Sequence, residues 1–332
     1  MMVGRLAPSP TGILHAGNLF SAAIAAAHVV SHGGQLILRI EDIDTPRCVP
    51  GAAELMVRHL RWLGLEWHAG PDTAGGPGPW FQSERTHLYE QAFNRLQQSG
   101  LLYPCTCSRK DIDDVLSAPH GLPPGMEYPN LCDALGAPPE SERRQQPHAW
   151  RFRSRGEVSF RDGVCGEVHE RLDDRGDFVV RRRDKLFAYQ LAVVVDDMTM
   201  GVTSVVRGRD LLDSTGRQIA LWRALGGSPP AWMHVPLVVH SDGQRLSKRD
   251  AAMGADGLAE RGWTGPLMLG AFSAILNGHD SLNPLTIELF AKELNIQSLV
   301  RPFLTLPNAF FESPTAFDAW LTKSPMPSKD PE

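Results

Sequence analysis

Apolar residues in the first 70 positions fall alternately into short continuous runs and into segments with helical spacing. The runs Val3–Ala7 and Gln35–Ile40 predict two buried strands. Helical spacing, ended by glycine in each case, predicts helices from about Gly17 to Ser31 and over Gly51–Leu63. Because strand–helix–strand–helix order favours right-handed crossovers, this pattern predicts an α/β fold built on a parallel sheet.

The pattern becomes less regular in the next part of the chain. Glycine and proline crowd the segment Gly70–Pro79, which predicts a loop. Arg85–Gln98 predicts a helix that ends before Gly100. Tyr103–Pro147 has three cysteines, many prolines and little periodicity, which indicates an insertion or a small subdomain.

Strand patterns return after residue 148. Short antiparallel strands are predicted within Ala149–Val180, and β-branched or buried runs predict further strands at Gln190–Val195, Val202–Val206 and Val235–Val239. Leu211–Leu225 predicts a helix. Beyond residue 250 the pattern is mostly helical, and the last residues are rich in proline.

Composition excludes several classes of protein. The 332 residues are 42% hydrophobic and 21% charged, which is ordinary for a globular protein and excludes wholesale disorder. The net charge of −5 excludes a protein that clamps nucleic acid by bulk positive charge, although a local basic strip remains possible. The longest apolar run, Leu19–Val30, is shorter than the about 20 residues that span a bilayer, and the N-terminus lacks the apolar segment of a signal peptide. We therefore expect a cytoplasmic protein without a membrane partner.

The first candidate for chemistry is the segment Arg5–Asn18, where the first strand gives way to the first helix. Free backbone N–H groups and the helix dipole at such a junction favour an anion, usually a nucleotide phosphate. Gly12 and Gly17 allow close approach of the backbone, and the imidazole of His15 can donate to a phosphate oxygen. The alternative is a helix start with an incidental histidine.

The second candidate is the basic segment Gly243–Arg249, which follows a buried strand. A flexible lysine beside serine and glycine can place a mobile charge at a leaving pyrophosphate. Alone, such a segment is more often a solvated surface loop. The two segments together favour the nucleotide interpretation.

The pair resembles the two signature motifs of class I aminoacyl-tRNA synthetases, with His15–Asn18 matching "HIGH" and Arg245–Arg249 matching "KMSKS". The sequence around the two motifs is similar to that of the glutamyl branch of this class, notably in Arg5–His15, Leu38–Asp44 and Phe187–Gly208. This resemblance implies a Rossmann-type catalytic core that joins glutamate to AMP. It implies catalytic roles for His15 and Lys248, with ATP held by His15, Gly17, Asn18, Arg245, Ser247 and Lys248.

The same resemblance implies a glutamate site. Glutamate carries two carboxylates and one ammonium, so a selective site needs two cationic donors and one anionic acceptor. Arginine can bind a carboxylate through two parallel N–H groups, and a glutamate side chain can pair with the ammonium. The implied residues are Arg5, Leu6, Ala7, Pro8, Ser9, Glu41, Tyr189 and Arg207. Taken singly, each charged residue is more often part of a surface ion pair, and a tyrosine is more often a core aromatic.

Three clustered cysteines, Cys105, Cys107 and Cys132, suggest a metal site, since disulfides are rare in a reducing cytoplasm. Zinc needs a fourth ligand, and the residues alone nominate His120. The family resemblance points instead to Tyr128, and implies one structural Zn²⁺ per chain. The alternative is a set of unrelated buried thiols. Cys48 and Cys165 have no such neighbours.

A basic strip lies in Ser141–Arg161, which has six arginines and two glutamates interleaved with aromatic residues. Positive charge and aromatic faces are what an RNA strand binds. A solvated strand face is an equally good interpretation.

The resemblance also implies a domain division. It predicts the first half of the Rossmann domain at residues 1–100, an inserted zinc subdomain at 101–180, the second half at 181–250, and a helical region at 251–332. The segment after Lys248 is too short for a full anticodon-binding domain, so we expect the stand-alone paralogues of this branch, the glutamyl-Q tRNA(Asp) synthetases, to be the nearest match.

That subfamily activates L-glutamate with MgATP and attaches it to the queuosine base of tRNA(Asp). The expected partners are therefore ATP with Mg²⁺, L-glutamate and queuosine-modified tRNA(Asp), and we expect a monomer. Two alternatives stay open. One is a truncated glutamyl-tRNA synthetase that charges the 3′ end, and the other is a non-catalytic relic that binds RNA or zinc.

Overall fold

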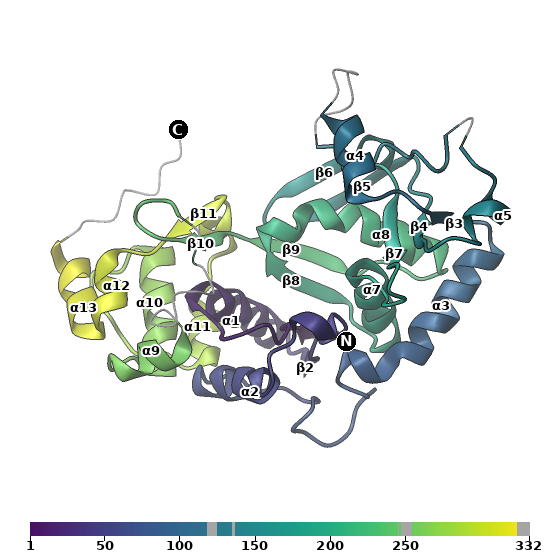
Figure 1. Cartoon of the computed structure of the whole chain (residues 1–332). Helices are drawn as coiled ribbons and strands as arrows, with labels where there is room; N and C mark the ends of the chain where they lie inside the picture. Colours follow the sequence, from purple (N-terminus) through teal and green to yellow (C-terminus); the bar gives the residue numbers. More distant parts are fainter. Residues whose placement is uncertain (118–124, 135–136, 245, 247–253, 324–332) are drawn as a thin grey trace.

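A six-stranded sheet forms the centre of the molecule in the computed structural model, which describes residues 1–117, 125–134, 137–244, 246 and 254–323 (Figure 1). The strand order is β2-β1-β8-β9-β5-β6. Every neighbouring pair is parallel except β5 with the edge strand β6. The bounds are β1 (Val3–Leu6), β2 (Gln35–Leu38), β5 (Glu157–Asp162), β6 (Gly166–Arg171), β8 (Ser204–Gly208) and β9 (Ala231–Val235). The predicted parallel α/β fold is confirmed.

Helix α1 (Ala16–Ser31) is the crossover from β1 to β2. Leu19, Phe20 and Ile24 are fully buried because the sheet lies on one side of α1 and the C-terminal helices on the other. This explains why α1 is apolar on almost every face. Within the described part of the chain, no helix has the length and apolar character needed to cross a membrane.

The other helices associated with the central sheet are α2 (Ala52–Trp62), α7 (Tyr189–Thr199) and α8 (Thr215–Ala224). Short 3₁₀ turns precede or join them at η1 (Thr45–Arg47), η2 (Gln82–Arg85) and η3 (Arg209–Ser214).

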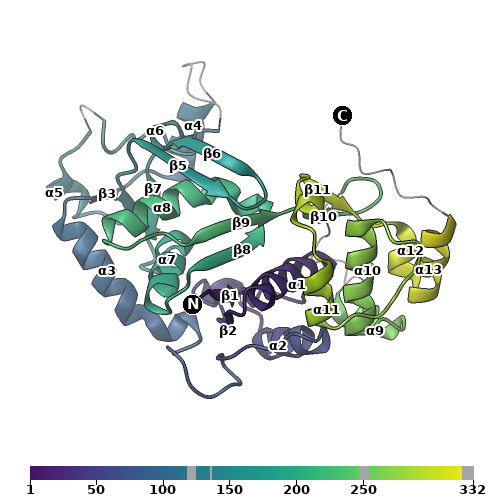
Figure 2. The ribbon, with the colours of Figure 1, turned by 180° about the vertical axis from the view of Figure 1, so that it is seen from behind.

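A second, antiparallel sheet lies at the end of the molecule away from the C-terminal helices (Figure 2). Its order is β3-β4-β7, with β3 (Leu102–Cys105), β4 (Ala149–Phe152) and β7 (Phe178–Arg181). The neighbouring helices are α3 (Thr86–Gln98), α4 (Arg109–Leu116), α5 (Glu140–Arg143) and α6 (Leu172–Arg175). The antiparallel strands predicted within Ala149–Val180 are present, but they divide between two sheets, because the β5–β6 hairpin extends the central sheet.

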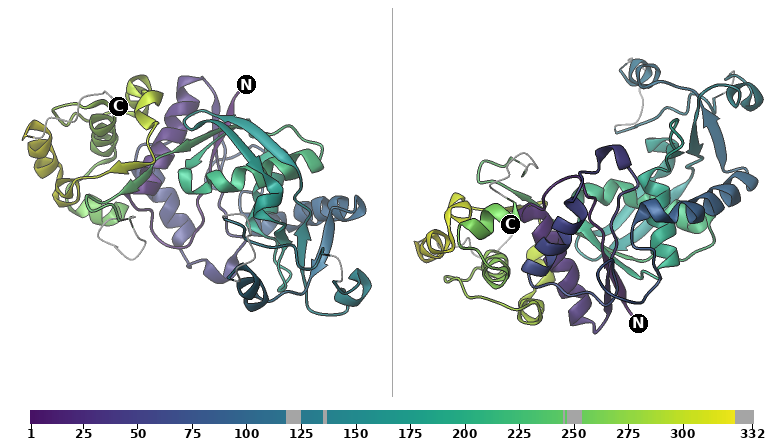
Figure 3. Two further views of the ribbon diagram at one scale, coloured as in Figure 1. Left: turned by 90° about the horizontal axis from the view of Figure 1, so that it is seen from above. Right: turned by 60° about the horizontal axis from the view of Figure 1, so that its bottom comes forward.

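The C-terminal region is mostly helical, as predicted, and packs on α1 (Figure 3). The rings of Phe20 and Phe272 meet edge to face with centroids 5.3 Å apart. The elements are α9 (Ala255–Glu260), α10 (Gly265–Asn277), α11 (Ile287–Glu293), η5 (Ile296–Leu299), α12 (Asn308–Glu312) and α13 (Pro314–Lys323), with β10 (Leu237–Val239) paired in parallel to β11 (Phe303–Thr305). The proline-rich tail lies outside the described residues, and the predicted domain division stays a prediction.

Three predicted elements need correction. Gln190–Val195 is part of α7 and not a strand. The spacing does not reveal this helix because Leu191–Val195 is buried on all sides and has no polar face that would show a helical period. The predicted strand Val235–Val239 is two strands, β9 and β10, separated at Pro236. The predicted helix Leu211–Leu225 becomes α-helical only at Thr215.

Candidate active site

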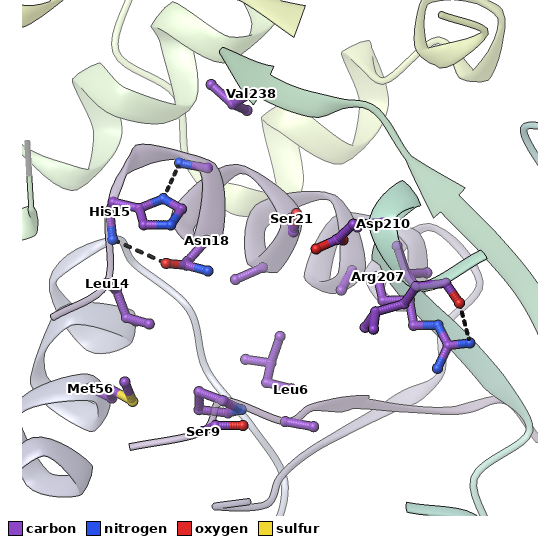
Figure 4. A pocket seen from close by; sticks show the side chains of 18 of the residues that line it. Leu6, Ser9, Leu14, His15, Asn18, Ser21, Met56, Arg207, Asp210 and Val238 are labelled. Atoms are coloured by element: carbon purple, nitrogen blue, oxygen red, sulfur yellow. Dashed lines mark hydrogen bonds between the residues drawn. The ribbon is translucent and has the colours of Figure 1, made fainter. Parts of the chain in front are cut away.

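A pocket of about 600 Å³ opens at the carboxyl ends of β1 and β8 (Figure 4). All the predicted glutamate-site residues and the described members of the predicted ATP site line it. These are Arg5, Leu6, Ala7, Pro8, Ser9, His15, Gly17, Asn18, Glu41, Tyr189 and Arg207. Residues 200 positions apart in the chain thus meet in one cavity.

The parallel strands explain why these residues meet. Strand β1 lies between β2 and β8, so the chain leaves β1 toward one side of the sheet and returns as β8 on the other. Arg5 lies on β1, Glu41 follows β2, and Arg207 lies on β8. Because parallel strands bring their carboxyl ends to the same edge, the point where strand order reverses is a natural ligand crevice.

His15 is the N-cap of α1 and points its ring toward the first turn (Figure 4). Nδ1 of His15 accepts a hydrogen bond from the backbone N–H of Gly17 at 3.2 Å. The backbone N–H of His15 donates to Oδ1 of Asn18 at 3.2 Å. Since Nδ1 accepts, a neutral ring carries its proton on Nε2. His15 can therefore donate from Nε2 to an anion while it caps the helix.

The basic segment predicted to hold ATP lies mainly outside the described residues, and Arg245, Ser247 and Lys248 are among those not described. One described residue of the segment lies at the pocket, and the residues that follow the segment contact the start of α1. Leu246 lines the cavity, and Gly254 bridges to His15, with the N–H of Ala255 donating to the carbonyl of Leu14 at 3.0 Å.

Arg5 is buried, with 5% of its surface exposed, yet it makes few hydrogen bonds within the described part of the chain. Its Nη1 donates to the carbonyl of Val206 at 3.2 Å, and its Nε has no hydrogen-bond partner there, lying 3.6 Å from Oδ1 of Asp197. A buried guanidinium with unused N–H groups at the wall of a pocket suits a carboxylate ligand.

Arg207 is held more tightly than the sequence suggested. Its Nε donates to His234 at 3.0 Å and its Nη1 to Gln218 at 2.8 Å, while Nη2 donates to Thr215 at 2.9 Å and to the carbonyl of Leu211 at 3.1 Å. Four of its five N–H groups therefore have partners within the chain. In this arrangement Arg207 can offer a carboxylate one hydrogen bond, so the expected bidentate contact fits Arg5 but not Arg207.

Glu41 is held by Arg39, a fully buried arginine that sequence reasoning did not assign to the site. Nη2 of Arg39 donates to Oε1 of Glu41 at 2.9 Å, and its Nη1 donates to Asp197 at 2.8 Å. Burial raises the pKa of Glu41, and Arg39 opposes that rise. The signal was available, because an arginine inside a buried strand requires a carboxylate partner.

Tyr189 is the first residue of α7 and closes the same wall of the pocket. Burial raises the pKa of its phenol, and the charge of Glu41 adds to the rise while Arg207 opposes it. The phenol is therefore a neutral hydrogen-bonding group near two carboxylates and two arginines.

The predicted metal ligands come together next to the end of β3. The Sγ atoms of Cys105, Cys107 and Cys132 all lie within 4.8 Å of one another. The phenolic oxygen of Tyr128 lies 3.3 Å from Sγ of Cys105 and 3.6 Å from Sγ of Cys107. Tetrahedral zinc at about 2.3 Å from each sulfur would hold sulfurs roughly 3.8 Å apart, so the donor set and spacing fit such an ion. His120, the alternative ligand, lies outside the described residues.

The arginines of the basic strip Ser141–Arg161 have partners inside the chain. Arg143 and Arg151 are buried and donate to the carbonyls of Pro104 and Asp177 at 2.8 and 2.7 Å. The other four form ion pairs, with Glu140, Asp133, Asp177 and Glu167 among their partners. The strip is thus largely neutralised within the fold, which favours the structural interpretation over an RNA-binding one.

Comparison with known families settles the family. Residues 1–272 match the family described as "tRNA synthetases class I (E and Q), catalytic domain". The chain belongs to this family of class I synthetases. It is therefore an aminoacyl-tRNA synthetase-type ligase, and class I synthetases use ATP with Mg²⁺.

Two curated relatives place the chain within the class I synthetases. A "Glutamyl-Q tRNA(Asp) synthetase" of Symbiobacterium thermophilum is 44% identical over 313 residues, covering 92% of this chain and 96% of the relative. A "Glutamate--tRNA ligase 1" of Halorhodospira halophila is 40% identical over 290 residues, covering 86% of this chain and 60% of the relative. Both relatives support a glutamate-activating member of the class.

The fold agrees with this family. A crystal structure titled glutamate-tRNA synthetase from Elizabethkingia anophelis aligns with a TM-score of 0.80 at 24% identity, covering 93% of this chain and 69% of that one. This likeness shows that the two chains share the fold.

Proposed function

We propose that this chain activates L-glutamate with ATP to glutamyl-AMP without needing tRNA, and then transfers the glutamate to the queuosine base of tRNA(Asp). The observation that carries the proposal is a single pocket lined both by the start of α1, with His15, and by Arg5, Glu41, Tyr189 and Arg207. A phosphate-binding helix start and a donor set complementary to glutamate are what the first half-reaction requires.

Glutamate is held by its three charges in this proposal. Arg5 takes one carboxylate through two N–H groups, and Arg207 gives the second carboxylate a single N–H. Glu41 pairs with the ammonium, which favours the ionised form of this carboxylate against the effect of burial. The phenol of Tyr189 hydrogen-bonds to the bound amino acid beside them.

ATP enters as its Mg²⁺ complex, with its phosphates at the start of α1. His15 donates from Nε2 to a phosphate oxygen, and Gly17 and Asn18 let the nucleotide approach the helix end. Arg245, Ser247 and Lys248 stabilise charge on the leaving pyrophosphate. The α-carboxylate of glutamate attacks the α-phosphorus in line, so a new C–O–P linkage forms as the bond to pyrophosphate breaks. Positioning and charge stabilisation carry this step, and no covalent enzyme intermediate is needed.

One Zn²⁺ per chain is part of the proposal. Cys105, Cys107, Tyr128 and Cys132 would hold it, and its role is to fix the irregular segment that joins β3 to β4. Substrates of this kind are cytoplasmic, and we expect the chain to act there as a monomer.

The acceptor is the finer part of the proposal. Support comes from the relative in Symbiobacterium thermophilum, which carries the glutamyl-Q name and matches over 96% of its length. The match to a glutamate–tRNA ligase favours a second candidate, which charges the 3′ end of tRNA. A non-catalytic relic is the third alternative, and the buried charged groups of a complete glutamate site speak against it.

An isolated anticodon stem-loop separates the acceptors, because it has no 3′ terminal adenosine of the intact tRNA. We expect the stem-loop with queuosine to accept radiolabelled glutamate, and the same stem-loop with unmodified guanosine to accept none. Glutamate found only on the 3′ adenosine of intact tRNA would establish the second candidate. Charging of neither substrate by an enzyme that forms glutamyl-AMP would contradict both.

A further inference from the structure

A buried chain of hydrogen bonds leads from the edge of the sheet to Arg207. Asp162 ends β5 and His234 lies on the neighbouring strand β9 (Figure 2), and both are almost fully buried. Oδ2 of Asp162 lies 2.6 Å from Nδ1 of His234, and Nε2 of His234 lies 3.0 Å from Nε of Arg207. Neither Asp162 nor His234 lines the pocket itself.

The direction of each hydrogen bond is fixed by Arg207. A guanidinium has donors and no acceptor, so Nε2 of His234 must accept from Arg207 and cannot carry a proton. Oγ1 of Thr215 lies 3.1 Å from the same nitrogen, and its hydroxyl can donate to it as well. The proton of a neutral imidazole then lies on Nδ1 and donates to Asp162. Burial lowers the pKa of His234, although Asp162 opposes that effect, so the ring stays neutral near pH 7. The hydrogen bond from His234 and two backbone N–H groups outweigh burial and bring the pKa of Asp162 to about 2.

We propose that Asp162 and His234 are positioning residues for glutamate binding, in which Asp162 fixes the Nδ1–H tautomer of His234 and the unprotonated Nε2 aims the guanidinium of Arg207 at the substrate carboxylate. This inference rests on the proposed function, since it assigns Arg207 to glutamate. A structural role alone would hold the strands together whichever ring nitrogen carried the proton.

The variant Asp162→Asn tests the tautomer with almost no change in volume. Oδ1 of Asp162 accepts backbone N–H groups of Val164, Cys165 and His234 at 2.9, 2.8 and 3.2 Å. These three donors hold the amide oxygen of an asparagine in the Oδ1 position, and its NH₂ then faces His234. Nδ1 must become the acceptor and Nε2 the donor. Nε–H of Arg207 then loses its acceptor, and Nε2–H turns toward Oγ1 of Thr215, which also accepts from Nη2 of Arg207.

The experiment measures glutamate-dependent pyrophosphate exchange in the full-length chain. We expect Asp162→Asn to raise the KM for glutamate by about tenfold or more and to leave the KM for ATP within about twofold. Glu167→Gln, on the same hairpin but exposed, is the matched control and should change neither KM.

Nitrogen-15 NMR of labelled histidine gives a second readout that does not depend on activity. The resonances of His234, identified by their loss in His234→Gln, should report Nδ1–H in the wild type and Nε2–H in Asp162→Asn. Three results would overturn the inference: Nε2–H in the wild type, an unchanged glutamate KM in folded Asp162→Asn, or a parallel rise of both KM values. A wild type that performs no exchange would contradict the proposed function instead, and the NMR result would still decide the tautomer.

Discussion

Arg5 and Arg207 look equivalent in the sequence but differ in how many of their N–H groups are already hydrogen-bonded in the structure. Arg5 makes one hydrogen bond within the described chain and has a buried Nε without a hydrogen-bond partner, whereas Arg207 has four of its N–H groups engaged. Arg5 can therefore bind a carboxylate through two N–H groups, whereas Arg207 can donate only one N–H group to it. We therefore assign most of the carboxylate affinity to Arg5.

The substitution Arg5→Lys tests that assignment. Lysine keeps the charge but cannot present two parallel N–H groups. Losing a charge-assisted hydrogen bond costs about 1.5–3 kcal/mol, so we expect the KM for glutamate to rise roughly 10- to 100-fold. The KM for ATP should hardly change. Arg161→Lys, at an exposed position, is the control. Thermal unfolding of both variants checks that changing the Arg5 partner of Asp197 leaves the protein folded.

Lys248, the second predicted catalytic residue, lies outside the described residues, but its role can be tested by substitution. A charge that acts on the leaving pyrophosphate stabilises the transition state more than bound glutamate. Lys248→Ala should therefore lower the rate of glutamyl-AMP formation by about tenfold or more, with glutamate affinity nearly unchanged. Single-turnover kinetics and calorimetric binding separate the two effects, with Lys323→Ala as the control. Loss of glutamate binding with an unchanged rate would mean that Lys248 has another role.

Among the helices and strands, hydrophobic periodicity predicted the type of an element only where one face of it is exposed to solvent. Helices α2 and α3 were predicted to within a few residues, because their apolar and polar positions alternate with a helical period. The buried elements β1, α1 and β2 were predicted from their apolar runs and from the glycines that follow α1. Helix α7 was missed because Leu191–Val195 is buried on every side. The two acids that follow, Asp196 and Asp197, were the clue, since they pair with Arg85 and Arg39 inside the core.

The only residues of the small buried cluster around Cys105 other than Tyr103 are the predicted zinc ligands Tyr128 and Cys132 and Cys105 itself, within the described part of the chain. We expect about one zinc per chain after exhaustive dialysis, measured by elemental analysis. Cys132→Ser should lower the zinc content and the unfolding temperature, while Cys165→Ser and His120→Ala should leave both unchanged. Loss of zinc in His120→Ala with retention in Tyr128→Phe would restore histidine as the fourth ligand.

At the scale of the whole molecule, the parallel sheet could be predicted but its strand order could not. Local spacing shows that β1 and β2 belong to one crossover unit, whereas the insertion of β8 beside β1 is a contact between residues 200 positions apart. The first motif still located the pocket, because it follows the carboxyl end of β1. The partners that hold the site, Arg39, Asp162 and His234, carry no motif and became visible only through contacts across strands.

We propose that the pocket at the carboxyl ends of β1 and β8 activates glutamate. Exchange of radiolabelled pyrophosphate into ATP measures that step directly, with the purified chain, MgATP and a single amino acid. We expect exchange with L-glutamate in the absence of tRNA and none with L-aspartate, whose shorter side chain cannot reach both arginines while its ammonium pairs with Glu41. No exchange at saturating glutamate, or equal exchange with aspartate, would contradict the account.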